Sequence, residues 1–350
     1  MNLLSKASLA AIVTVTVIGC GSESPTQEET AEDQANNRYD LALADRLSVF
    51  GKLPSEAVND NNPLTKEKVS LGHKLYFDTQ LSKEGNISCN SCHNLATYGV
   101  DNLPFSPGDD GSLGGRNSPT VLNAALHISQ FWDGRAADIE EQAGMPILNP
   151  VEMAIPNEEF LVNRLNESDD YKILFSKAFP DTDGEITYER LRMAIAAFER
   201  KLITPSRFDQ YLSGDKSALS LKEKKGLSSF LDIGCTTCHN GNGLGGNSMR
   251  KFGERHDYWE STKSDKIDRG VAEETDNDMD NYIFKVSSLR NIEKTGPYFH
   301  DGSVNDLNEA IRIMAHTQLD KELTDDQVSN ISAFLSSLTG EVPKEYQAAP

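Results

Sequence analysis

The apolar positions of the chain follow a helical period wherever the pattern is clear. Within residues 66–77, Val69, Leu71, Leu75 and Tyr76 fall on one broad face of a helix, with polar residues between them. The same kind of spacing predicts amphipathic helices in five further segments: 158–179, 187–203, 219–232, 306–316 and 325–338. Because no segment shows sustained two-residue alternation, we predict an all-α fold.

Two segments between these helices, 101–117 and 241–280, are rich in Gly, Pro, Asn and Asp and are too long to be simple connections. Loops of this length commonly carry function. The chain has 350 residues, which suits two domains of about 150 residues each. We place their boundaries at 46–205 and 206–340, followed by a short tail at 341–350.

The N-terminus has the features of a bacterial secretory signal over residues 1–19. Lys6 precedes an apolar run, 7–18, that is too short to span a bilayer. The run ends in Val-Ile-Gly before Cys20, which resembles a lipoprotein processing box with Cys20 as the lipidated residue. Residues 20–45 would then form a polar tether to the periplasmic side of a membrane. The alternative is an ordinary signal peptide that releases a soluble periplasmic protein.

The formal net charge of −20 excludes a nucleic-acid partner, because phosphate binding requires clustered Lys and Arg. Such a charge favours a basic or dipolar protein partner. It is equally compatible with an acidic surface that only keeps a secreted protein soluble.

The cysteines carry the clearest chemical signal. Residues 89–93 read Cys-Asn-Ser-Cys-His and residues 235–239 read Cys-Thr-Thr-Cys-His, so both are C-x-x-C-H motifs of the type that attaches haem c. The two thiols form thioether bonds to the haem and the adjacent His is the proximal iron ligand. The predicted haem residues are Cys89, Cys92 and His93 in the first motif, and Cys235, Cys238 and His239 in the second. The alternatives are a zinc site or a redox dithiol.

Further motifs surround both haem motifs in a fixed order. They are Leu-Gly at 71–72, Leu-Tyr-Phe-Asp at 75–78, Arg-Asn-Ser-Pro-Thr-Val-Leu-Asn at 116–123, Gln-Phe-Trp-Asp-Gly-Arg at 130–135, Phe-Lys-Val at 284–286, Leu-Arg-Asn at 289–291 and Gly-Pro-Tyr-Phe-His-Asp-Gly-Ser at 296–303. From about residue 50 to 340 the chain resembles the bacterial di-haem cytochrome c peroxidases and their MauG-like relatives.

This resemblance implies different roles for the two haems. The haem of the first motif would be the peroxidatic one, and the haem of the second would transfer electrons, with Met314 as its sixth ligand. A His and Met pair raises the reduction potential and fills both axial positions. Because the MauG-like oxidases have Tyr where this chain has Met314, the methionine favours a peroxidase.

At the peroxidatic haem, hydrogen peroxide needs an open iron position and a group that moves a proton between its oxygens. The resemblance assigns the proton transfer to Glu152 and the orientation of peroxide to Gln142. It also places Trp132 between the haems as an electron bridge. One calcium ion would be held at the domain interface by Asn117 and by the carbonyl groups of Thr295 and Pro297.

The chain departs from the family pattern at one position. Many members carry a distal His that blocks the peroxidatic iron until the other haem is reduced, and this chain has Asp109 there. Asp is a poor ligand to low-spin haem iron, so we predict a peroxidatic haem that needs no reductive activation. His73 and His127 are possible substitutes, although their apolar surroundings favour a core or surface role.

The sequence therefore predicts a periplasmic enzyme with two haem c groups that reduces hydrogen peroxide. Its electron donor would be a small cytochrome c or a cupredoxin, and the family often forms homodimers. Two alternatives remain: a MauG-like oxidase that acts on a protein or small molecule, and a plain di-haem electron carrier.

Overall fold

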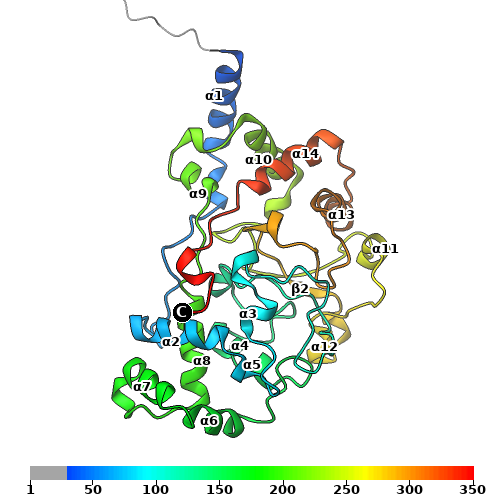
Figure 1. Cartoon of the computed structure of the whole chain (residues 1–350). Coiled ribbons are helices and arrows are strands. Elements are labelled where there is room, and N and C mark those ends of the chain that lie inside the picture. Colours follow the sequence, from blue (N-terminus) through cyan, green and yellow to red (C-terminus); the bar gives the residue numbers. More distant parts are fainter. Residues whose placement is uncertain (1–29) are drawn as a thin grey trace, which may run out of the picture.

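The computed structural model describes residues 30–350 and is built mostly from helices (Figure 1). The predicted signal segment and Cys20 lie outside the described residues. Within residues 30–350, no helix combines the length and the apolar character that crossing a membrane requires.

The described chain contains fourteen α-helices joined by loops and short 3-10 turns. The helices are α1 Ala31–Ala44, α2 Lys66–Phe77, α3 Cys89–Cys92, α4 Ile139–Gln142, α5 Met145–Leu148, α6 Glu158–Asn166, α7 Asp169–Ala178, α8 Tyr188–Glu199, α9 Arg207–Leu212, α10 Leu221–Ile233, α11 Tyr258–Thr262, α12 Ala272–Thr275, α13 Leu307–Leu319 and α14 Asp325–Ser336. The mostly helical prediction is thus confirmed. The segment 158–179 forms two helices because the Ser168 side chain caps a new one by accepting the Tyr171 N–H.

The prediction of a strictly all-α fold is wrong in one detail. Strands β1 Met249–Lys251 and β2 Ile283–Lys285 pair antiparallel, with Met249 opposite Lys285. Each strand has three residues, so neither shows enough alternation to be recognised in the sequence. The sheet organises the long loop that follows the second C-x-x-C-H motif.

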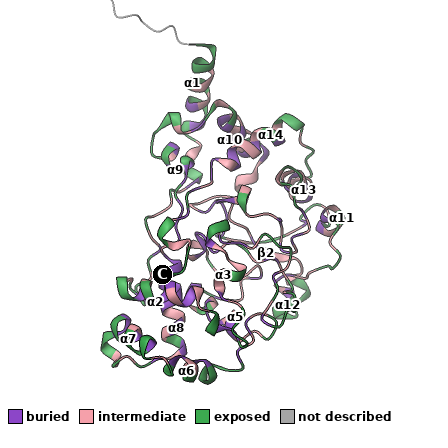
Figure 2. Cartoon of the chain, viewed as in Figure 1, coloured by how far each residue is buried: buried purple, intermediate pink, exposed green. Residues whose placement is uncertain are grey.

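Two helix pairs repeat the same packing, one beside each motif. A Cβ at Gly72 of α2 would lie 1.9 Å from the Ala194 carbonyl oxygen of α8. A Cβ at Gly226 of α10 would lie 1.9 Å from the Asn330 carbonyl oxygen of α14. Glycine therefore allows each pair to approach closely, and Figure 2 shows buried residues on the packed helices and exposed ones on outer helices such as α6.

The prediction that residues 20–45 form a polar tether is wrong for residues 31–44, which form helix α1. Thr30 and Asp33 form a capping box that starts the helix. Asp40, on its buried side, accepts hydrogen bonds from the Tyr211 hydroxyl at 2.7 Å and from Lys224 Nζ at 3.0 Å. Residues 31–44 are therefore part of the folded protein. The sequence did not reveal this because the partners of Asp40 are distant in the chain.

The last ten residues lie against the first helix pair, α2 and α8 (Figure 1). The Tyr346 ring packs on Phe198 and on His73, with ring centroids 5.2 and 5.5 Å apart. His73 Nε2 is 2.9 Å from the Ala348 carbonyl oxygen, and the imidazole stacks on Phe198. The predicted tail is thus packed, and His73 is a core residue rather than a substitute iron ligand.

Candidate active site

A single cavity of about 1150 Å³ is lined by residues of both C-x-x-C-H motifs. It exceeds the range of about 300–1,000 Å³ that is usual for one small-molecule site, as a site for two large cofactors should. All the site residues predicted from the sequence lie on its wall: Cys89, Cys92, His93, Asn117, Trp132, Gln142, Glu152, Cys235, Cys238, His239, Thr295, Pro297 and Met314. Residues more than 200 positions apart are thus brought to one site.

The two motif histidines are held in the same way. His93 Nδ1 is 2.9 Å from the Pro119 carbonyl oxygen, and His239 Nδ1 is 3.1 Å from that of Leu244. Each Nδ1–H donates to a carbonyl, which leaves Nε2 as the free acceptor. Burial lowers the pKa of both imidazoles, so both remain neutral, the form that binds iron.

None of the four motif cysteines forms a disulfide within the described residues. Burial raises the pKa of Cys92 and of Cys235 to about 11, and that of Cys89 further still. Each motif places two thiols and an adjacent histidine on the wall of one cavity, which is the donor set that haem c attachment requires. Across residues 30–350, no three His, Cys, Asp or Glu side chains are grouped as a metal site. The donor set fits haem c.

A carboxyl group and an amide, those of Glu152 and Gln142, lie on the cavity wall. Glu152 follows α5, and its Oε1 accepts a hydrogen bond of 2.8 Å from Asn149 Nδ2. Burial raises the pKa of Glu152, while the positive charge of Arg135 opposes this shift. Gln142 is the last residue of α4, which Asp138 caps at its start. This arrangement can accept, hold and return a proton.

Asp109 does not line the cavity. Its carboxylate is buried and accepts the N–H of Glu84 at 2.7 Å and the N–H of Asn86 at 3.3 Å. Its own N–H donates to the Glu152 carbonyl oxygen at 2.7 Å. The adjacent Gly108 is so close to Val151 that a Cβ would lie 2.0 Å from the Val151 carbonyl oxygen. Asp109 therefore fixes the distal loop against the backbone of Glu152.

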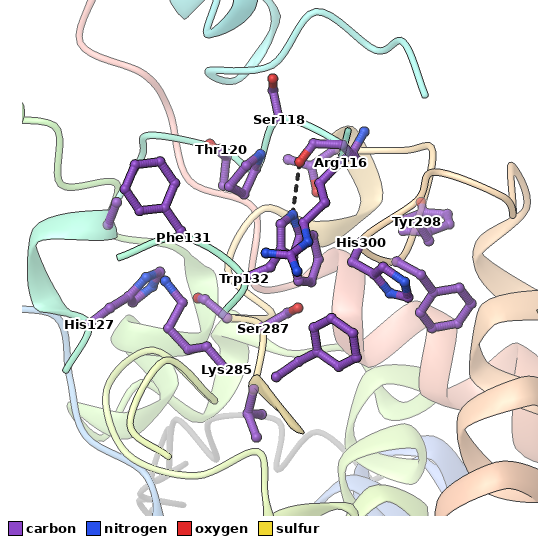
Figure 3. Close-up of a pocket in the computed structure, with 18 of the residues that line it drawn as sticks. Arg116, Ser118, Thr120, His127, Phe131, Trp132, Lys285, Ser287, Tyr298 and His300 are labelled. Carbon is purple, nitrogen blue, oxygen red and sulfur yellow. Dashed lines mark hydrogen bonds between the residues drawn. The ribbon is translucent and has the colours of Figure 1, made fainter. Parts of the chain in front are cut away.

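Trp132 is held from two sides (Figure 3). Its indole Nε1 donates to the Asn117 carbonyl oxygen at 2.8 Å, and its own carbonyl accepts the Lys285 N–H at 2.7 Å. The His300 ring lies edge-on at a centroid distance of 6.3 Å. The orientation of the indole is therefore fixed by the main chain of both halves of the protein.

The sequence indicated no role for Arg116 or Lys285 of the cavity wall, and for His127 only that of a possible substitute iron ligand. Arg116 forms an ion pair with Asp268 that includes a contact of 2.6 Å between Nε and Oδ2. His127 and Lys285 lie on the same wall. Arg116 and Lys285 belong to recognised motifs, but their roles depend on contacts more than 150 positions away, which no local pattern shows.

Comparisons with known proteins agree with this geometry. Residues 66–217 match the family model described as di-haem cytochrome c peroxidase. The chain is 43% identical to the cytochrome c551 peroxidase of Pseudomonas aeruginosa, covering 88% of this chain and 90% of the relative. It is 44% identical to the enzyme of the same name from Nitrosomonas europaea, over 83% and 85% of the two chains.

More distant relatives carry the MauG name. The methylamine utilization protein MauG of Methylophilus methylotrophus is 33% identical over 80% of this chain and 84% of the relative. The crystal structure of a MauG-like protein associated with microbial copper homeostasis superposes with a TM-score of 0.74 at 28% identity, covering 85% of this chain and 95% of the other. The chain therefore belongs to the di-haem cytochrome c peroxidase family, whose members are oxidoreductases that act on peroxide.

Proposed function

We propose that this protein reduces hydrogen peroxide to water at the haem of the first motif, with electrons that enter at the haem of the second. The observation that carries this proposal is the different equipment of the cavity beside each motif. Burial and, to a smaller extent, the charge of Glu152 raise the pKa of Cys92, which places Glu152 near the first motif. Met314 belongs to α13, whose Leu307 and Ile311 pack in one hydrophobic cluster with Cys235 of the second motif. A proton-transfer group belongs where peroxide reacts, and a thioether belongs where iron only transfers electrons.

The two haems would be carried by two cytochrome c-type domains. The first, 46–205, is built on the α2–α8 pair, and the second, 206–340, is built on the α10–α14 pair, with α1 packed on it. Cys89, Cys92 and His93 would hold one haem, and Cys235, Cys238, His239 and Met314 the other. When bound, the haems supply the peroxide-binding metal and the electron store.

Glu152 and Gln142 handle peroxide and its protons. The deprotonated carboxylate of Glu152 accepts a proton from peroxide and returns it to the leaving oxygen as water departs. Its raised pKa brings proton uptake and release closer to neutral pH. The amide of Gln142 orients peroxide by hydrogen bonding. Trp132, whose indole is held by the Asn117 carbonyl, would provide the bridge for electron transfer between the two haems.

The fixed position of Asp109 supports a peroxidase that is active in its fully oxidised form. The test is hydrogen peroxide turnover with an artificial electron donor, comparing oxidised protein with protein whose second haem has been reduced. We expect equal rates without a lag. Activity only after reduction would show that another ligand blocks the iron. Inactivity in both states would favour a substrate oxidase or an electron carrier instead.

A calcium ion would hold the two proposed domains in a fixed position relative to each other. Asn117 Nδ2 donates to the Leu103 carbonyl at 2.9 Å, which leaves Asn117 Oδ1 to join the carbonyls of Thr295 and Pro297 on the same wall. Three neutral oxygens make a weak site, since calcium prefers carboxylates as well. Removal of calcium by a chelator should therefore be easy, and it should slow electron transfer between the haems without releasing them.

The remaining assignments concern place and partners. The signal segment and Cys20 would put the enzyme on the periplasmic side of a membrane, where a small cytochrome c or cupredoxin would supply electrons. The protein would also form a homodimer. Mass spectrometry of the mature N-terminus would test the lipid on Cys20, and ultracentrifugation would test the dimer.

A further inference from the structure

Lys285 and His127 lie together on the cavity wall next to Trp132, and both lack the partners that buried polar groups require. Figure 3 shows the Lys285 side chain extending toward the His127 ring, with Trp132 beside them. Lys285 belongs to β2, and His127 belongs to the loop that leads to Trp132. The peroxidase chemistry proposed above uses neither side chain.

The Lys285 ammonium group is buried without a carboxylate of its own. The residue is 9% exposed, and Nζ donates one hydrogen bond, to the Ser129 carbonyl at 2.9 Å. The nearby carboxylate of Asp133 is already paired with Arg116 and Arg135. Burial lowers the pKa of Lys285 to about 8, which reflects this poorly compensated charge. An ammonium has three protons to donate, so its requirement is unmet.

Other buried lysines in residues 30–350 are satisfied by the protein itself. Lys224 Nζ is 3.0 Å from a carboxylate oxygen of Asp40. Lys68 Nζ donates to Asn62 Oδ1 and to the Pro63 carbonyl, both at 3.1 Å. Neither lysine lines the cavity. Lys285 therefore differs in both respects: it lacks a full set of partners, and it faces the space that a cofactor would fill.

His127 presents a neutral imidazole to the same place. Both ring nitrogens are buried and have no hydrogen-bond partner within the described structure. Burial and the positive charge of Lys285 lower the pKa of His127 to about 3. Gly246 makes room for the ring, since a Cβ there would lie 2.3 Å from His127 Cδ2. A neutral imidazole still offers one N–H donor, which a bound anion would accept.

We propose that Lys285 and His127 together bind one carboxylate of a haem, the ammonium as counter-charge and the imidazole as hydrogen-bond donor. This assignment rests on the proposed presence of two haems. A haem brings two propionate carboxylates, and an anion is the ligand that an unpaired buried cation requires. Because Lys285 N–H also holds the Trp132 carbonyl, the site fixes one haem edge relative to Trp132. It also places a positive charge beside that haem, which favours its reduced state.

The test is potentiometric titration of the complete di-haem protein, which gives the midpoint potential of each haem independently of peroxide activity. Lys285→Gln should lower the potential of one haem and leave the other unchanged, and Lys285→Arg should retain most of the original value. His127→Phe should shift the same haem in the same direction by a smaller amount. The haem that responds identifies which of the two carries the bound carboxylate.

Lys224→Gln is the matched control, because it removes a buried lysine that already has a carboxylate partner. It should lower the thermal stability and leave both potentials unchanged. The proposal is overturned if Lys285→Gln and His127→Phe keep full haem content and move neither potential. It is also overturned if the potential of the unmodified protein follows added chloride, since a small anion would then occupy the site. Shifted potentials in a protein without peroxidase activity would support this site and refute the proposed function.

Discussion

The two ends of the cavity are built on the same scaffold and differ in the residue that faces each motif. Each end has a helix pair joined at a glycine, a C-x-x-C-H motif and a histidine whose Nδ1 is tied to a carbonyl. Near Cys92 of the first motif the wall carries the carboxyl of Glu152. Near Cys235 of the second it carries α13, which packs there through Leu307 and Ile311 and includes Met314. The scaffold therefore provides a haem site twice, and one or two wall residues decide what each haem does.

Removal of the carboxyl group at the first end should have the largest effect. Glu152→Gln keeps the size of the side chain and loses its ability to accept a proton, so kcat/KM for peroxide should fall about 10²–10⁴-fold. Haem content should stay as in the unmodified protein, and loss of the negative charge should, if anything, raise the midpoint potential of the first haem, which does not account for a lower rate. Steady-state turnover with an artificial donor measures the loss. A variant with nearly full activity would show that another group transfers the proton.

The pH dependence of kcat/KM sharpens this assignment. Glu152 must be deprotonated to act as the base, so activity should fall as the pH drops through its pKa. Burial raises that pKa, so the fall should begin at a higher pH than for an ordinary glutamate. The acid limb should vanish in Glu152→Gln. An acid limb that survives the substitution would belong to a different residue.

Replacement of the Met314 thioether at the second end of the cavity should have the next largest effect on turnover. Met314→Leu nearly conserves volume, so the fold should be kept at a cost below about 1.5 kcal/mol. Loss of the axial sulfur should lower the potential of the second haem and reduce donor-driven turnover by an order of magnitude. Peroxide binding to the oxidised first haem, followed by absorption spectroscopy, should be unchanged. An unaltered potential would show that Met314 is only a packing residue.

The residues that the sequence singled out line one cavity, and they could be singled out because they belong to short motifs. The attachment pattern located both haem motifs, and the resemblance extended this to Glu152, Gln142 and Met314, all of which line the cavity. Periodicity predicted the bounds of α2 to the residue, since an N-cap threonine and an apolar face coincide there.

What the sequence did not show depends on contacts between distant segments. Helix α1 is polar along most of its length, and its stability depends on Tyr211 and Lys224, far along the chain. Strands β1 and β2 are too short to alternate. The buried charge of Lys285 is revealed only by the tertiary structure, because a lysine in a motif looks the same whether it is paired or not.

The two glycine contacts test whether the halves fold as separate units. Gly72→Ala and Gly226→Ala would each place a methyl group against a carbonyl oxygen of the partner helix, so each should cost about 2–3 kcal/mol. If the halves are domains, calorimetry should show each substitution lowering a different unfolding transition. Ser70→Ala, on the exposed side of α2, is the control and should change stability by less than about 0.5 kcal/mol. One shared transition, lowered by both, would show a single cooperative unit.

Replacement of Asp109 should have the smallest effect on the protein. It tests whether the Asp109 carboxylate anchors the distal loop or is an iron ligand at the first end of the cavity. Asp109→Asn keeps one carbonyl oxygen for the Glu84 N–H and weakens the bond to Asn86, a loss of about 1 kcal/mol. Amide hydrogen exchange at these two residues should therefore quicken about fivefold. Asp110→Asn is the control, because that exposed side chain reaches only its own turn at Ser112. If Asp109→Asn instead altered the spin state of the first haem without changing exchange, the carboxylate would have to reach the iron, and the two ends of the cavity would be more alike than their walls indicate.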